Sequence, residues 1–163
     1  KIIDARALAA FELQRAAVMD PILKVIFYLV IRDEARHVTF GVNYLEEFVA
    51  TLSDEEKEDR AEFAYEACVV MRNRFGSDNV MKHYGWNTEE AQEVLNQSEN
   101  ARLFNNLLFS KIMPNLKRIG LLTEKTVEKY EEMNILQFQD LEDHGNIDWD
   151  ELSLPLDYSS KTA

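Results

Sequence analysis

The chain has 163 residues, enough for one domain with its own hydrophobic core, and its single cysteine, Cys68, excludes a disulfide within the chain. A formal net charge of −12, with no cluster of Lys and Arg, excludes a basic surface for nucleic acid or an anionic membrane. The most apolar run, residues 22–31, is about half as long as a bilayer requires. We therefore expect a cytoplasmic protein with no nucleic-acid or membrane partner.

The first two expected helices form a hairpin. Residues 1–18 are rich in Ala and Leu and contain no Gly or Pro, which favours a helix. Asp20 followed by Pro21 is typical of a helix start, and the apolar pattern that follows continues to about Leu52. Because the turn at residues 19–21 is short, we expect the two helices to pack as an antiparallel pair.

Capping signals mark the later helices. Ser53 with Glu56, and Asn87 with Glu90, have the spacing of a capping box, and Thr123 is a further N-cap. Pro114 is expected to end the helix that precedes it, because proline cannot donate the backbone hydrogen bond of a helix interior. Four further helices are expected, at about residues 54–75, 78–84, 88–113 and 123–138.

These elements predict an all-α fold, a helical bundle made by residues 1–138. Strand-like alternation and internal repeats are absent from the sequence. Residues 139–163 are acidic, contain Gly145 and Pro155, and have little periodicity. We expect them to form an extended tail that lies on the bundle or is disordered.

One stripe of the second helix carries the residues that indicate chemistry. Its members step by three and four residues, as one face of a helix does: Phe27, Val30, Glu34, His37, Gly41, Tyr44 and Phe48. We expect this stripe to face the core. A buried Glu34 and His37 would need a compensating partner, and a metal ion is a natural one, although a salt-bridged pair is the plainer alternative.

The antiparallel hairpin predicts a third ligand. Residues 4 and 34 are equally far from residue 19 in the turn, so Asp4 should lie opposite Glu34 across the hairpin. Glu12 is the rival carboxylate, but its level partner is residue 26, about 12 Å along the axis from Glu34. The candidate metal ligands are therefore Asp4, Glu34 and His37.

An acidic residue on one helix and Glu-x-x-His on its antiparallel neighbour make half of the ligand set of di-iron and di-manganese carboxylate bundles. Carboxylates with one imidazole per metal suit iron or manganese, and a complete site would hold two ions. Zinc would bind such ligands too. The chain has no second Glu-x-x-His. The other half should come from a helix pair elsewhere in a longer protein or from a second copy in a homodimer.

The segments Leu8-Ala9-Ala10-Phe11 and Asp33-Glu34-Ala35-Arg36-His37-Val38, with Phe40-Gly41 after them, resemble the second helix pair of the ferritin-like di-iron carboxylate superfamily. That superfamily includes ribonucleotide reductase small subunits and bacterial di-iron oxygenases. The resemblance implies that Glu34 and His37 are metal ligands and that Asp33 orients a histidine of the other helix pair. Asp4 occupies a position where the family usually has Glu.

The resemblance implies a ferritin-like bundle, or the C-terminal half of one, with extra C-terminal helices. Because the sequence begins without Met and already in a helical pattern, we expect the C-terminal part of a longer protein. The expected function is an oxidoreductase that activates dioxygen and oxidises a small organic substrate. The alternatives are a ferritin-type protein that oxidises and stores iron, and a catalytically inactive helical module kept for interactions.

Overall fold

The structure, a computed structural model, describes residues 2–73 and 78–145, with side chains from Ala5 onward. This part of the chain is an all-α bundle without strands, as expected. None of its helices is both long enough and apolar enough to cross a membrane. The helices are α1 (Ile2–Ala17), α2 (Pro21–Ala50), α3 (Asp54–Asn73), α4 (Asp78–His83), α5 (Thr88–Gln97), α6 (Glu99–Arg118), α7 (Glu124–Glu132) and the short 3-10 helix η1 (Leu136–Phe138).

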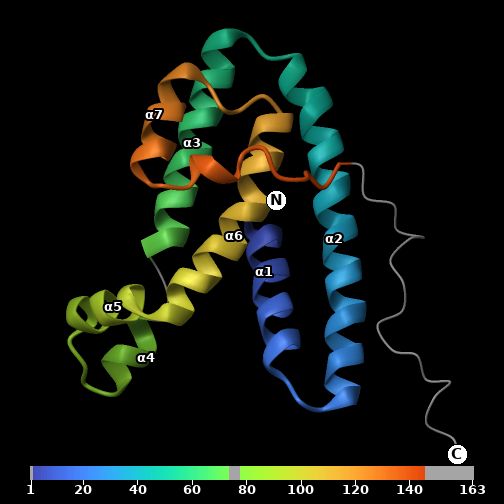
Figure 1. The fold of residues 1–163 in the computed structure, drawn as a ribbon. Helices are drawn as coiled ribbons and strands as arrows, with labels where there is room; N and C mark the ends of the chain where they lie inside the picture. The colour runs from blue at the N-terminus through green and yellow to red at the C-terminus, as the bar shows by residue number, and fades with distance from the viewer. Residues whose placement is uncertain (1, 74–77, 146–163) are drawn as a thin grey trace, which may run out of the picture.

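Helices α1 and α2 form the expected antiparallel hairpin (Figure 1). Asp20 caps α2, where its Oδ1 accepts hydrogen bonds from the backbone N–H groups of Ile22 at 2.8 Å and Leu23 at 3.1 Å. The rings of Phe11 and Phe27 lie 6.1 Å apart between their centroids. Because these two residues are equally far from residue 19, their contact confirms the expected register of the hairpin.

Both predicted capping boxes lie at helix starts. Before α3, the backbone N–H of Ser53 donates to Glu56 Oε2 at 2.9 Å, and Ser53 Oγ accepts from the N–H of Glu56 at 3.3 Å. Before α5, Asn87 Oδ1 accepts from the N–H groups of Glu89 and Glu90. The expected end of the third helix, at residues 74–77, lies outside the described residues.

The single helix expected at residues 88–113 is wrong in two ways. The helix is interrupted at Ser98, so that α5 and α6 are separate helices. The backbone of Ser98 is extended, and its Oγ accepts a hydrogen bond from the N–H of Ala101. Helix α6 then continues through Pro114 to Arg118. A proline inside a helix costs about 3 kcal/mol. The burial of Ile112, Met113 and Leu116 around it offsets that cost, because each side chain is at most 3% exposed.

The helix expected at residues 123–138 is also divided. Helix α7 ends at Glu132, and Asn134 has a positive φ of 54°, a conformation that ends helices. The chain then makes the short helix η1. Thr123 caps α7 as expected, and its backbone N–H donates to Thr126 Oγ1 at 3.1 Å.

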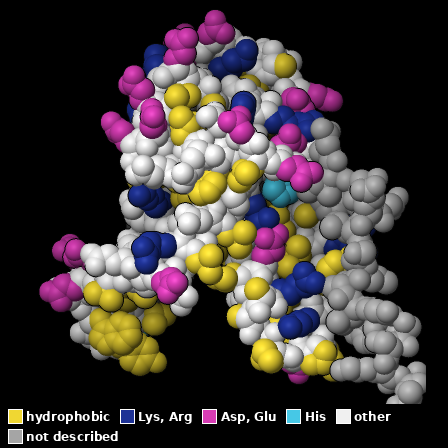
Figure 2. Space-filling model, viewed as in Figure 1, with side chains coloured by type: hydrophobic (Ala, Val, Ile, Leu, Met, Phe, Trp, Pro, Cys, Tyr) yellow, Lys and Arg dark blue, Asp and Glu magenta, His cyan; other side chains and the backbone are white. Residues whose placement is uncertain are grey.

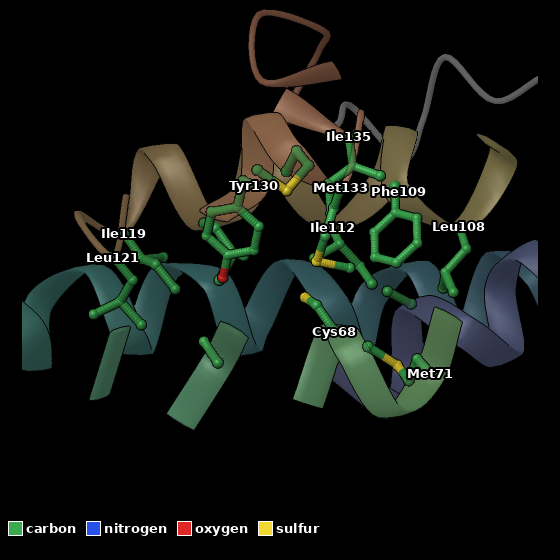
Figure 3. Packing of buried hydrophobic residues seen from close by; sticks show 14 of the residues in the cluster. Cys68, Met71, Leu108, Phe109, Ile112, Ile119, Leu121, Tyr130, Met133 and Ile135 are labelled. Atoms are coloured by element: carbon green, nitrogen blue, oxygen red, sulfur yellow. The ribbon is translucent and has the colours of Figure 1, made fainter. Parts of the chain in front are cut away.

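The bundle is centred on α6, which lies against α1, α2, α5 and η1 (Figure 1). Helix α7 packs on α3, and α4 packs on α5 at one end of the molecule. Figure 3 shows Leu108, Phe109 and Ile112 of α6 directed into the core, near Cys68 and Met71 of α3. A continuous core therefore joins the hairpin to the later helices.

The described part of the acidic tail, residues 139–145, lies on the bundle. Asp143 Oδ1 accepts from Arg118 Nη1 at 2.7 Å, and Asp140 pairs with Lys117. His144 is buried, and its backbone N–H donates to Asn115 Oδ1 at 2.8 Å. The remainder of the expected tail, residues 146–163, lies outside the described residues.

Candidate metal centre

Glu34 and His37 are adjacent on α2, one turn apart. Glu34 Oε2 lies 3.7 Å from His37 Nδ1, which is beyond hydrogen-bond distance but close enough for both atoms to approach one cation. The Glu34 side chain is 27% exposed and that of His37 is 68% exposed. The two predicted ligands are therefore brought together on an accessible part of the helix and not in the core of this chain.

The predicted stripe is not the core-facing stripe, and this prediction is wrong. Tyr44 is 60% exposed and Phe48 is 43% exposed, although Gly41 is buried. A different stripe of α2 packs on the bundle. It is the predicted stripe shifted by one residue towards the C-terminus. It comprises Tyr28, Ile31, Ala35, Val38, Val42, Leu45 and Val49.

Two neighbouring stripes of α2 have the same helical period, and their charges decide between them. The stripe that packs contains no ionisable group except the Tyr28 hydroxyl, whereas the predicted stripe contains a carboxylate and an imidazole. Burying the carboxylate of Glu34 and the imidazole of His37 against α1 and α6 without a partner would cost roughly several kcal/mol. The helix is therefore rotated by about one residue, or 100°, from the expected orientation.

The outer side of α2 is apolar along most of its length. Phe40, Tyr44 and Phe48 stack on one another there, with ring centroids 6.5 and 6.4 Å apart. Ile22 and Ile26, about four and three turns before His37 along this side, are 69% and 47% exposed. We call this surface, from Ile22 to Phe48, the outer face of α2. The candidate ligands lie midway along it.

The third candidate ligand, Asp4, lies in α1, but its side chain is outside the described part of the structure. Its backbone position can still be placed by register. Asp4 precedes Phe11 by seven residues, and Glu34 follows Phe27 by seven. Seven residues are about two helical turns, so each residue lies on nearly the same side of its helix as the phenylalanine. Because Phe11 and Phe27 are in contact, the Asp4 position is level with Glu34 in the hairpin.

The rival carboxylate has another partner. Glu12 Oε1 lies 2.7 Å from Lys111 Nζ, on the side of the hairpin that faces α6. Asp33, expected to orient a histidine, is 66% exposed and lies 3.4 Å from Arg36 Nη1. That ion pair lies within one helix and is accessible to water, so it leaves Asp33 available to another partner.

Among the side chains that the structure describes, those of residues 5–73 and 78–145, no three or more of His, Cys, Asp or Glu meet in a group that could hold a metal. Glu34 and His37 provide one carboxylate and one imidazole on the same side of α2, which is fewer donors than a metal site needs. Comparisons with protein-family models, curated proteins and solved structures gave no match. The link to the ferritin-like superfamily therefore depends on the resemblance in α1 and α2.

The sequence did not indicate a second ionisable site, around His144. Asn115 Nδ2 lies 3.1 Å from His144 Nδ1 and also donates to the carbonyl of Lys111 at 2.7 Å. Since Asn115 Nδ2 is a donor, His144 Nδ1 accepts and its ring proton is on Nε2. Burial, together with the nearby positive charge of Lys111, lowers the pKa of His144 to about 4. His144 is therefore neutral at pH 7.

A pH dependence of stability follows from His144. Between an ordinary pKa of 6.5 and the folded-state pKa of about 4, the unfolded chain binds a proton that the folded chain does not. Stability due to the neutral ring is thus fully present above pH 6.5 and is lost as the pH falls towards 4, by up to about 3 kcal/mol. We expect His144→Gln to lose less stability than the natural protein between about pH 7 and pH 4.5, measured by urea unfolding. An equal loss in both proteins would contradict this expectation.

Proposed function

We propose that α1 and α2 supply half of a two-metal carboxylate centre, and that the complete centre makes the protein an oxidoreductase acting on a small organic substrate. The observation that carries the proposal is the placement of Glu34 and His37, 3.7 Å apart, in the middle of the outer face of α2. A surface with exposed apolar side chains towards both ends of a helix, at Ile22 and Ile26 and again at Phe40, Tyr44 and Phe48, and with a carboxylate and an imidazole between them, is suited to meet a similar surface.

The chain's own residues have separable roles in this proposal. Glu34 would bind a metal through its carboxylate, His37 through its imidazole, and Asp4 would provide a further carboxylate from the level position on α1. Asp33 would accept a hydrogen bond from a histidine of the opposing helix pair and fix that ring. Two iron ions, or iron with manganese, would supply the reduction of dioxygen when bound. Phe40 and Tyr44, now exposed, would be covered and would exclude water from the centre.

The other half of the metal centre could come from either of two sources, and each predicts a different number of metal ions per chain. A second copy, related by a two-fold axis, would bring its own Asp4, Glu34 and His37. A helix pair elsewhere in a longer protein would bring different residues. In the first case we expect about two metals per dimer, and in the second about two per longer chain.

The test is the metal content of the natural, full-length protein together with its mass in solution. The protein would be reconstituted with iron(II) or manganese(II) without oxygen, desalted, and analysed by elemental analysis and by light scattering. Retention of about two ions per complete centre, followed by oxygen consumption on exposure to air, would support the proposal. A folded helical protein that retains neither metal would contradict it.

A catalytically inactive interaction module is the second candidate, and a specific observation favours it. The stacked rings of Phe40, Tyr44 and Phe48 form an exposed aromatic row that could bind a partner helix without any metal. Assembly that is unaffected by chelators, in a protein that retains no metal, would favour this candidate over the oxidoreductase.

A further inference from the structure

A cleft of about 600 Å³ lies on the side of the α1–α2 hairpin that faces α6, and the proposed metal centre does not use it. Its walls come from α1, α2 and α6, and the ring of His144 borders it. The volume is in the range of cavities that enclose small organic ligands. Figure 2 shows basic side chains among hydrophobic ones over the part of the hairpin that is nearest its turn.

The charge of this cleft is opposite to that of the chain. Four cationic side chains line it, Arg15, Lys24, Arg32 and Lys111, against one carboxylate, Glu12. The whole chain, by contrast, has a formal net charge of −12. Such a local excess of positive charge attracts anions, and low-dielectric walls strengthen the attraction.

Most of these cations are not neutralised by the described residues. Lys111 Nζ pairs with Glu12 at 2.7 Å, and both side chains are largely covered. Arg15 lies over the ring of Tyr28, with Cζ 5.5 Å from the ring centroid. No carboxylate of the described residues lies within ion-pair distance of Arg15, Lys24 or Arg32.

Arg32 gives the most specific indication of a ligand. Its Nε is shielded from solvent and has no hydrogen-bond partner within the described structure. A buried donor on a charged group is costly when it is left unpaired. Because Nε is covered, an oxyanion that enters the cleft would meet the terminal amino groups of Arg32, which lines the cleft and is half-buried. Carboxylates and phosphates accept charge-assisted hydrogen bonds from these groups.

The remaining wall is apolar. Leu8, Tyr28 and Ala35 of this wall are buried, so Ala16 and Ile31 are its accessible apolar residues, and a ligand would contact their hydrocarbon as well as the cations. His144 adds no charge at neutral pH, because burial lowers the pKa of its ring to about 4. An inorganic ion would leave the apolar wall unused, whereas an organic anion would cover both parts of the cleft.

We propose that the cleft binds an organic anion, with a carboxylate or phosphate head group at Arg32 and Lys24 and an apolar body against Ala16 and Ile31. This inference does not depend on the metal centre, which lies around the α2 axis from Arg32. The shared chemistry is an oxyanion on an apolar body, and the choice between the two head groups is left to the experiment.

The test measures the binding of 2-naphthoate and 2-naphthyl phosphate to the natural protein by isothermal titration calorimetry. We expect at least one of them to bind, and the tighter one identifies the head group. The uncharged 2-naphthamide and inorganic phosphate should each bind about tenfold more weakly or worse, since each lacks one half of the recognition. Equal binding of 2-naphthamide, or no binding of either anion, would overturn the proposal.

Variants locate the binding site. Arg32→Gln should weaken binding of the preferred anion by about tenfold or more, because it removes a charge-assisted hydrogen bond. Arg60→Gln is the matched control, since Arg60 is an exposed arginine on α3 that pairs with Asp59 at 3.2 Å. Circular dichroism checks the fold of each variant. Lys24→Gln is the second variant and should weaken binding in the same direction. Unchanged affinity in both folded cleft variants would contradict the proposal.

Discussion

Glu34→Ala and His37→Ala are each expected to abolish metal binding by the full-length protein while leaving the fold intact. In the proposed centre each residue is a ligand, and removing one ligand leaves too few donors to retain the ion through desalting. The stability cost, compared without metal and for residues 1–163 alone, should stay within about 0.5 kcal/mol, because in this structure His37 is largely exposed and its contact with Glu34 is longer than a hydrogen bond. Elemental analysis and thermal unfolding measure the two quantities.

Matched controls are available for both variants. Glu47 is an exposed glutamate of the same helix, and His83 is an exposed histidine of α4. Glu47→Ala and His83→Ala should retain the full metal content of the natural protein. If Glu34→Ala and His37→Ala also retained it, the metal centre would have to be placed elsewhere and the proposed function would lose its basis.

Leu108→Ala is expected to have the largest effect on stability. Leu108 is fully buried in α6, where the hairpin and the later helices share one core (Figure 3). Truncation there removes buried apolar surface and leaves a cavity, which costs about 2.7 to 5 kcal/mol in comparable sites. For a domain of this size that is a large part of the total stability of about 5 to 15 kcal/mol. Urea unfolding followed by circular dichroism measures the change.

Leu103 offers a control on the same helix with the same substitution. It is 52% exposed, so Leu103→Ala should change the free energy of unfolding by no more than about 0.5 kcal/mol. Similar losses at both positions would show that helix propensity and not core packing determines the stability of α6. Leu108→Ala should also lower the stability of the proposed centre indirectly, because α6 supports the hairpin through α1.

The outer face of α2 is where the structure differs most from the orientation that the sequence predicted for the candidate ligands. Position 34 and position 37 were expected in a core, and in this chain they are at a surface. The expectation that the chain holds half of a metal ligand set stays a prediction, since the structure contains no metal and the side chain of Asp4 lies outside its described part. The same surface carries the aromatic row of Phe40, Tyr44 and Phe48. A second helix pair that covered this row would remove its apolar surface from water, which is favourable.

Local sequence signals predicted four helix starts correctly, missed the start of α6 after Ser98, and placed some helix ends wrongly. Asp20, Ser53, Asn87 and Thr123 all cap helices, because a cap needs only hydrogen bonds to residues two or three positions away. Pro114 was expected to stop α6 and does not. Its local cost is offset by side chains of α6 that are buried against distant parts of the chain, which no local pattern reveals.

The sequence by itself determined the all-α class, the hairpin and its register, since these follow from helical periodicity, capping and the length of one turn. Only the tertiary structure decided which of two adjacent stripes of α2 is packed, and it brought Arg32, Lys111 and His144 to one cleft. Both stripes have the same period, so the choice depends on contacts with α1 and α6 and on the cost of burying Glu34 and His37. Residues 32, 111 and 144 are far apart in the chain, and no spacing rule relates them.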